Sequence, residues 1–338
     1  MSEAPAARWL PAPPAGWDEL LGDADASFTH DPHFVRALAD MLPGVEARFL
    51  AIGREGALEG GMAVVVERRG AWSWWHALPF GLPGAPLARA GDHARVDMAC
   101  ADAFARALDE CGALGGEWVG YRPFSPPPRA ALEALEGETR ILTAWRVDLS
   151  SGLEAARARM DREARRGVRL AHERGVTVVG DPLALEEVYA LHRAQARAWP
   201  RHRPLPLELS RRLVERPMAA LLVARDGRGV VAGVLAMAAR GEAFVWWSGA
   251  RPEARASHAY TALLWGAAEW AAARGCRSLN LGSSAGLEPV EVFKRDLGAQ
   301  PFDYPVRWLA PRRPGPIGRL IVGAQALRRR GRHRGRAA

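Results

Sequence analysis

One lysine and one asparagine occur in the whole chain, and both lie in the segment LNLGSSAGLEPVEVFKRDLGAQP, residues 279–301. All other basic residues are arginines, so Lys294 stands in a chain that uses arginine everywhere else for a positive charge. An ammonium is a compact point charge, whereas a guanidinium is a broad planar fork, so a pocket built for one does not suit the other. This predicts a specific role for the Lys294 ammonium. The alternative is an ordinary surface lysine on the helix predicted over PVEVFKRDLG.

Two serines follow the strand predicted for the residues around Asn280. The end of a strand is a usual place for binding sites in α/β folds. Ser283 and Ser284 would therefore contact a substrate, or alternatively cap the helix that follows. Asn280, inside the strand, would satisfy a buried backbone group.

Four arginines share one face of the helix predicted in LEAARARMDREARRGVRLAHERG, because they are spaced three or four residues apart. Such a face could grip phosphate groups, and a solvated basic face is the equal alternative. The four are Arg162, Arg165, Arg166 and Arg169.

The histidines of THDPHF, His30 and His33, are better explained by a helix start than by a metal pair. Asp31 would cap that helix and Pro32 would stand in its first turn. The tryptophans of WSWWH and of the later WW pair are expected to pack in the core, with stacking on a nucleic-acid base as the alternative.

An internal repeat shows how these residues are positioned. Residues 54–77 resemble residues 225–250, with matching turns and matching Trp-Trp pairs, and each copy predicts three short strands. A helical pattern and another strand follow each copy, and Gly275 stands where a glycine ends the second helix. This predicts a duplicated α/β fold, with lobes over residues 1–150 and 151–310 and an Arg-rich tail over 311–338.

The composition is that of a globular protein, with 49% hydrophobic and 25% charged residues. The net charge of +8 comes from the tail, because residues 311–338 contain nine arginines and no acid, which leaves the rest at 37 minus 38, or −1. We therefore expect no broad basic face on the body. The tail is predicted to be a frayed basic extension, and the alternative is weak attachment to RNA or an anionic membrane surface.

The three cysteines have no CxxC spacing, which favours reduced thiols over a disulfide or a zinc site. The N-terminal segment lacks the charged and apolar regions of a secretory signal, and no apolar run approaches the length of a membrane span. These features predict a cytoplasmic protein.

Several stretches together resemble the FemAB family of peptidyltransferases, which have tandem acyl-CoA N-acyltransferase (GNAT) lobes. ALPFGLPGAPLA, residues 77–88, is similar to the family's Leu-Pro-Phe and Gly-Gly-Pro-Leu loop, with Ala85 in place of the second glycine. REARRGVRLAHERGVTV is similar to its Arg-rich segment, and GSS followed by FKRDLGAQPFDYPVRW to its final turn and Phe-Lys closure. The resemblance covers about residues 25–310 and implies two GNAT-like lobes, each a mixed sheet flanked by helices.

The resemblance also implies a reaction, in which an acceptor amine attacks an activated acyl carbonyl. Lys294 would be catalytic, stabilising the oxyanion or holding the phosphate or terminal nucleotide of the donor. The residues implied to bind substrate or donor are Phe80, Arg162, Arg166, Arg255, His258, Tyr260, Ser283, Ser284, Phe293 and Tyr304. No general base and no metal site can be assigned.

The co-substrate implied is aminoacyl-tRNA or acyl-CoA, with no permanently bound cofactor. RASHAY, beginning at Arg255, lacks the glycines that let backbone N–H groups approach the pyrophosphate of CoA, which favours an aminoacyl-tRNA donor. The acceptor implied is a small molecule or an envelope precursor. A CoA-dependent N-acyltransferase is the second hypothesis, and a non-catalytic module that binds RNA or an anionic surface is the third.

Overall fold

The computed structural model describes residues 6–23, 25–54, 57–70, 72–78, 82–89, 91–197 and 204–310, with the backbone alone for Asp23. Packing divides the chain into two compact units. Among the described residues, unit 1 contains 6–141 and 304–310, and unit 2 spans Leu142–Asp303.

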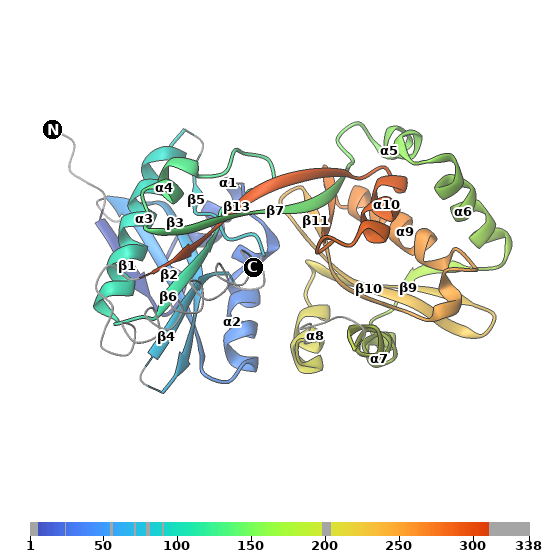
Figure 1. Ribbon diagram of the computed structural model, residues 1–338, viewed down its shortest axis with the longest axis horizontal. Coiled ribbons are helices and arrows are strands. Elements are labelled where there is room, and N and C mark those ends of the chain that lie inside the picture. Colours follow the sequence, from blue (N-terminus) through green and yellow to red (C-terminus); the bar gives the residue numbers. More distant parts are fainter. Residues whose placement is uncertain are drawn as a thin grey trace, which may run out of the picture. The chain divides into compact units, whose positions relative to one another are not determined.

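The sheet of unit 1 has the strand order β1-β2-β3-β4-β6-β13, with β5 paired to β3 (Figure 1). All neighbours are antiparallel except β4 and β6, which are parallel. The strands are β1 (Ala6–Leu10), β2 (Val45–Arg54), β3 (Ala57–Arg69), β4 (Trp72–Ala77), β5 (Leu87–Ala88), β6 (Gly115–Val119) and the later part of β13 (Gln300–Leu309).

Helices cover both faces of this sheet. α3 (His93–Glu110) packs Val96, Cys100 and Phe104 into a core with alternate residues of β3, β4 and β6, while α1 (Trp17–Asp23) and α2 (Pro32–Met41) contact β2 and β3. The short α4 (Arg129–Glu133) lies against α3. α2 begins as predicted, because the Asp31 carboxylate accepts a hydrogen bond of 2.7 Å from the His33 N–H and Pro32 is the first helical residue.

The sheet of unit 2 has the order β7-β12-β11-β10-β9-β8, in which only β11 and β12 are parallel. Its strands are the later part of β7 (Gly137–Asp148), β8 (Thr177–Gly180), β9 (Ala219–Asp226), β10 (Gly229–Ala239), β11 (Glu242–Ala250) and β12 (Ser278–Ser283). Its helices are α5 (Leu153–Arg159), α6 (Arg162–Glu173), α7 (Leu185–Ala196), α8 (Leu207–Val214), α9 (Ala259–Ala273) and α10 (Glu288–Asp296).

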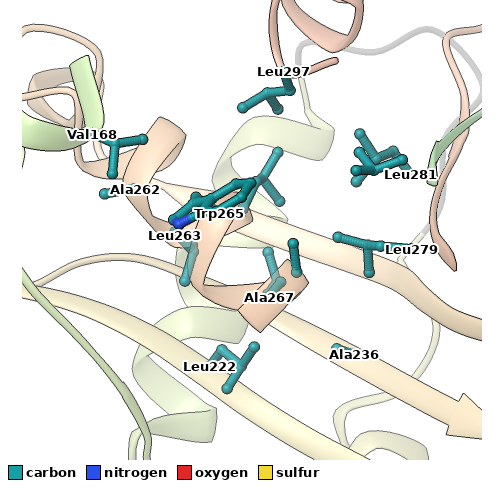
Figure 2. Packing of buried hydrophobic residues seen from close by; sticks show 14 of the residues in the cluster. Val168, Leu222, Ala236, Ala262, Leu263, Trp265, Ala267, Leu279, Leu281 and Leu297 are labelled. Carbon is teal, nitrogen blue, oxygen red and sulfur yellow. The ribbon is translucent and has the colours of Figure 1, made fainter. Parts of the chain in front are cut away.

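The core of unit 2 forms around α9, which is apolar on nearly all sides. Figure 2 shows Leu263 and Trp265 of α9 among side chains of α6, β9, β10 and β12. On the other face of the sheet α7 lies so close to β10 that a Cβ at Gly233 would stand 2.6 Å from Val188. α9 ends at the predicted glycine, since Gly275 has a φ of +72°.

The two units share two strands. β7 begins in unit 1 and ends in unit 2, and β13 begins in unit 2 and ends in unit 1. A division by packing therefore falls inside both strands, whereas the sequence places the boundary near residue 150, where β7 has ended. The return of β13 to unit 1 leaves no mark in the sequence, because the residues of β13 look like those of any strand.

The predicted fold class is confirmed: each unit is a mixed sheet flanked by helices. Within the described ranges, no helix is long and apolar enough to cross a membrane.

Candidate functional site

Lys294 is buried at the carboxyl end of β12. Its side chain is on the last turn of α10, is 7% exposed, and donates hydrogen bonds from Nζ to the carbonyl oxygens of Gly282 (2.9 Å) and Ser283 (3.0 Å). The alternative of an ordinary surface lysine is therefore wrong. An ammonium has three N–H donors, so one donor remains after these two bonds are made.

Burial changes the acidity of this ammonium. It lowers the pKa of Lys294 from 10.5 to about 8, and the negative charge of Glu291, one turn earlier on α10, acts in the opposite direction. Among the residues that the structure describes, no carboxylate lies within ion-pair distance of Nζ. Lys294 is thus a mostly protonated, poorly hydrated cation at neutral pH, and such groups are frequent at functional sites.

The turn after β12 fixes the two carbonyl groups that Lys294 binds. The Gly282 N–H donates to Oδ1 of Asn280 at 2.8 Å, and Ser283 Oγ accepts from the Ala285 N–H at 3.1 Å. Gly282 has a φ of +68°, a conformation that glycine adopts without strain. Asn280 therefore satisfies a backbone group as predicted, and Ser283 stabilises the turn itself rather than α10.

Ser284 differs from its neighbour. It is buried, and among the described residues its Oγ has no hydrogen-bond partner. Its backbone carbonyl accepts from the Leu287 N–H at 2.9 Å, which closes the turn before α10.

Two aromatic rings stack where α10 meets α9. Phe293, adjacent to Lys294 on α10, stacks on Tyr260 of α9 with ring centroids 5.6 Å apart and an interplanar angle of 28°. The Tyr260 hydroxyl and Ser248 Oγ of β11 are 2.9 Å apart. Burial raises the pKa of Tyr260, so it is a neutral phenol at physiological pH. The fold thus brings Tyr260 and Phe293 together from two helices, and Phe293 directly precedes Lys294 on α10.

The pairing between β11 and β12 ends before the turn that binds Lys294. The parallel ladder between β11 and β12 joins Glu242–Phe244 to Ser278–Asn280 and does not continue along the remaining described residues of either strand. β11 also bulges, because its register with β10 shifts after Leu235. Bulges often adjoin active sites, and ligands of α/β proteins bind beyond the carboxyl ends of parallel strands.

Most arginines of the predicted basic face on α6 form ion pairs or hydrogen bonds within the protein. Arg166 pairs with Glu163 and Arg169 with Glu173, each at 3.4 Å, and Arg165 Nη1 donates to the Met160 carbonyl at 2.9 Å. Arg162 and Arg166 are exposed. No contact in the structure joins either of them to Lys294, so their predicted role in donor binding remains a prediction.

The turn before α9 is closed on itself. The Ser257 N–H donates to the Glu253 carbonyl (3.1 Å), and the His258 N–H donates to the Arg255 carbonyl (3.2 Å). His258 has a φ of +57°, and its ring faces α6, where a Cβ at Gly167 would lie 3.0 Å from Nδ1. These N–H groups therefore do not form an open cradle for phosphate. Arg255 is exposed.

The structure places one further predicted binding residue in unit 1. Tyr304 belongs to unit 1, where its ring packs 5.3 Å from that of Tyr121, and burial together with Glu117 raises its pKa to about 12. Phe80 lies outside the described residues, as does the tail over residues 311–338.

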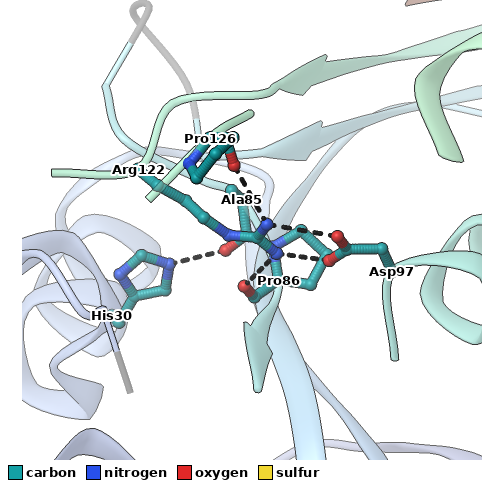
Figure 3. A network of polar contacts seen from close by, with 6 residues as sticks. All are labelled: His30, Ala85, Pro86, Asp97, Arg122 and Pro126. Atoms are coloured by element: carbon teal, nitrogen blue, oxygen red, sulfur yellow. Dashed lines mark hydrogen bonds and ion pairs between the residues drawn. The ribbon is translucent and has the colours of Figure 1, made fainter. Parts of the chain in front are cut away.

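A buried polar network in unit 1 was not anticipated from the sequence (Figure 3). Arg122 forms a two-pronged ion pair with Asp97 of α3 and donates to the Pro86 carbonyl at 3.1 Å. His30 Nδ1 accepts from the Ser27 N–H, so Nε2 carries the proton and donates to the Ala85 carbonyl at 2.9 Å. Burial lowers the pKa of His30 and keeps it neutral.

This network holds the loop that precedes β5. One sequence signal could have revealed it: Asp97 lies on the apolar face of the predicted helix over 92–114, where an acid needs a buried partner. A Cβ at Gly84 would stand 2.0 Å from the Ala77 carbonyl oxygen, so glycine is required there. Ala85 fits without strain, which explains why the second glycine of the FemAB-like loop is dispensable here.

Comparison with known proteins finds a family similar to most of the second unit. Residues 154–295, which contain Tyr260, Phe293 and Lys294, match the family described as "Acetyltransferase (GNAT) domain". No curated protein sequence matches the chain.

Three solved structures have a similar fold. FemX aligns with a TM-score of 0.70 and 11% identity over 88% of this chain and 96% of its own. A tandem GNAT protein from the clavulanic acid biosynthesis pathway has a TM-score of 0.52 and 13% identity, over 90% of this chain and 98% of its own. The C-terminal domain of a putative lysylphosphatidylglycerol synthetase from Agrobacterium fabrum has a TM-score of 0.51 and 14% identity, over 80% and 85%. These matches confirm the expected tandem GNAT, FemAB-like fold.

Proposed function

We propose that this chain, whose residues 154–295 match the GNAT acetyltransferase family, is an acyltransferase that moves an aminoacyl or acyl group from an activated donor to an amine beside Lys294. The buried ammonium of Lys294 carries this proposal. It keeps one N–H donor after binding Gly282 and Ser283, and it lies at the end of the parallel strand pair.

The chemistry requires a positive group at the reacting carbonyl. Attack by a neutral amine on an ester or thioester forms a tetrahedral intermediate whose oxygen carries a negative charge. The third N–H of Lys294 would donate to that oxygen, and its poor hydration strengthens the interaction. The intermediate then collapses: the carbonyl re-forms, the bond from carbon to the donor oxygen or sulfur breaks, and the proton that the attacking nitrogen loses passes to that leaving atom, which gives the amide and a free alcohol or thiol.

We propose aminoacyl-tRNA as the donor. The closed turn before α9 supports this, because Ser257 and His258 use their N–H groups within the turn and do not offer them to the pyrophosphate of CoA. The stacked rings of Tyr260 and Phe293 offer an aromatic surface on which a terminal base could pack. The name of the Agrobacterium match also indicates transfer of an amino acid.

We propose that the acceptor is the amine of a small molecule or an envelope precursor, and that the reaction takes place in the cytoplasm. This acceptor class is the one that the sequence resemblance to the FemAB family implies.

The decisive test is a binding titration that uses the intrinsic tryptophan fluorescence of the full chain, with charged tRNA in one series and acetyl-CoA in the other, at fixed ionic strength. Lys294→Met retains the apolar stem and removes the charge. Arg295→Met is the matched control, because it removes one exposed cation from the next position of α10. Under the proposal, charged tRNA binds, Lys294→Met slows transfer to a model amine, and Arg295→Met behaves like the wild type.

The alternative donor is acyl-CoA. The tandem GNAT match, whose description mentions AcCoA, favours it. Saturable acetyl-CoA binding with no response to charged tRNA would replace the proposed donor. Transfer that proceeds unchanged in Lys294→Met would remove the catalytic role of the lysine with either donor.

A further inference from the structure

Unit 1 carries a partly uncovered sheet face rich in tryptophan. Trp72, Trp74 and His76 point to the same side of β4, opposite to Trp75, which packs against α3. The strand register places His76 opposite Glu117 of β6, and Glu117 opposite Trp308 of β13. We call these five residues the tryptophan face.

The tryptophan face is accessible and aromatic. Trp72 is 38% exposed and Trp308 is 42% exposed, and the rings of Trp74 and Trp308 meet edge to face with centroids 6.3 Å apart. Helices α1 and α2 contact the neighbouring strands β2 and β3. Exposed aromatic surface of this kind usually marks a place where another segment or molecule binds.

The charge of the tryptophan face favours a cation. The Glu117 side chain is 15% exposed, and its ion-pair neighbour in the described part of the chain is His76, at 3.6 Å. The guanidinium of Arg140 already lies over the Trp308 ring, 4.7 Å from its centroid. Indole faces next to carboxylates are the surroundings in which arginine binds best, because its planar cation stacks and forms hydrogen bonds at the same time.

β13 ends next to this surface, and an arginine-rich segment follows it in the sequence. β13 is antiparallel to β6, and β6 is parallel to β4, so the chain leaves Leu309 in the direction of Trp74 and Trp72. Arg312 and Arg313 follow within four residues. Four residues span about 13 Å when extended, and β13 and β4 are two strand spacings, or about 10 Å, apart.

We propose that the arginine tail, residues 311–338, docks on the tryptophan face of unit 1. Its arginines stack on Trp72 and Trp74 and pair with Glu117. The carboxylate of Glu67, on the strand next to Trp74, lies at the edge of the same surface, where it also pairs with Arg69. A docked tail cannot bind an anionic membrane or RNA at the same time, so docking would limit its access to such surfaces.

Tryptic cleavage of the full chain at the Arg319–Leu320 bond, followed by intact-mass spectrometry at low salt, tests the proposal. Cleavage reports the fraction of undocked tail when opening is faster than cutting. We expect Glu117→Gln and Trp74→Leu to be cleaved roughly five-fold faster than the wild type, as loss of one stacked or paired arginine contact would give. Salt at high concentration should abolish the difference. Glu208→Gln, on α8 of unit 2, is the matched control and should behave like the wild type.

A change in the tail alone separates docking from misfolding. Arg312→Gln combined with Arg313→Gln leaves every residue of the sheet unchanged and should speed cleavage about as much as Glu117→Gln does, which a misfolded sheet could not explain. Equal cleavage of the wild type and of all these variants would overturn the proposal. The proposal would also be overturned if the tail were protected from cleavage only in the presence of phosphatidylglycerol vesicles or RNA, and equally so in the wild type and in Glu117→Gln. The partner of the tail would then be that anionic surface.

Discussion

Lys294 should make the stability of unit 2 depend on pH in a way that one substitution removes. Its pKa falls from 10.5 to about 8 on folding because the side chain is buried. The folded state therefore binds fewer protons than the unfolded state between these two values, and the free energy of unfolding rises with pH in that window. Below pH 8 the wild type carries the full cost of the buried charge, which is about 3 kcal/mol.

The Lys294→Met variant lacks this ionisable group, so its stability does not change with pH for this reason. We expect the free energy of unfolding of the wild type, relative to Lys294→Met, to increase by about 2 kcal/mol between pH 7 and pH 9.5. Urea denaturation of both proteins across this range measures the difference, and groups that titrate equally in both cancel. Arg295→Met provides the control, with a constant offset from the wild type. A difference that does not change with pH would refute the lowered pKa and with it the description of Lys294 as a poorly hydrated cation.

Three further predictions concern catalysis and packing. Transfer should slow above about pH 8 as Lys294 loses its proton, and a rate that stays constant to pH 10 would show that the ammonium is not needed. Asp97→Asn should lower the free energy of unfolding by about 3 to 5 kcal/mol in calorimetry, because it leaves the buried Arg122 without its carboxylate. Gly167→Ala should lower the free energy of unfolding by about 1 kcal/mol, because the new methyl group approaches the His258 ring. His258→Gly, which suits the positive φ at position 258, should remove that loss when the two changes are combined. Additive effects of the two changes in thermal denaturation would contradict this.

The local features of the sequence predicted local structure well. The Asp-Pro start of α2 and the glycine after α9 appear where they were expected, because caps and turns depend on a few neighbouring residues. The order of strands and helices in the repeat predicted two mixed sheets. The division of β7 and β13 between the units was not predictable, since strand pairing over more than a hundred residues leaves no local pattern.

The candidate site was predicted in part. The rarity of lysine singled out Lys294, and the structure adds that this side chain is buried and bound to the Gly282 and Ser283 carbonyls. The spacing of the arginines on α6 was read correctly as one face, but spacing does not reveal that Glu163 and Glu173 pair with them. The Asp97–Arg122 pair was missed because its members are 25 residues apart and meet only in the folded chain.

The sequence by itself determined the fold class, the start of α2, the end of α9 and the residue types available for chemistry, because these follow from hydrophobic periodicity and from short-range capping. The single helix expected over LEAARARMDREARRGVRLAHERG was wrong: the chain forms two helices, α5 and α6, because Met160 is extended and the Asp161 carboxylate caps a new helix by accepting from the Glu163 N–H. Only the tertiary structure decided which of those residues meet and how their charges behave. Tyr260 and Phe293 stack although they belong to different helices, and the pKa of Lys294 is lowered by burial under groups distant in the sequence. Desolvation and contact geometry depend on the packing of the whole unit, so no local pattern of residues can encode them.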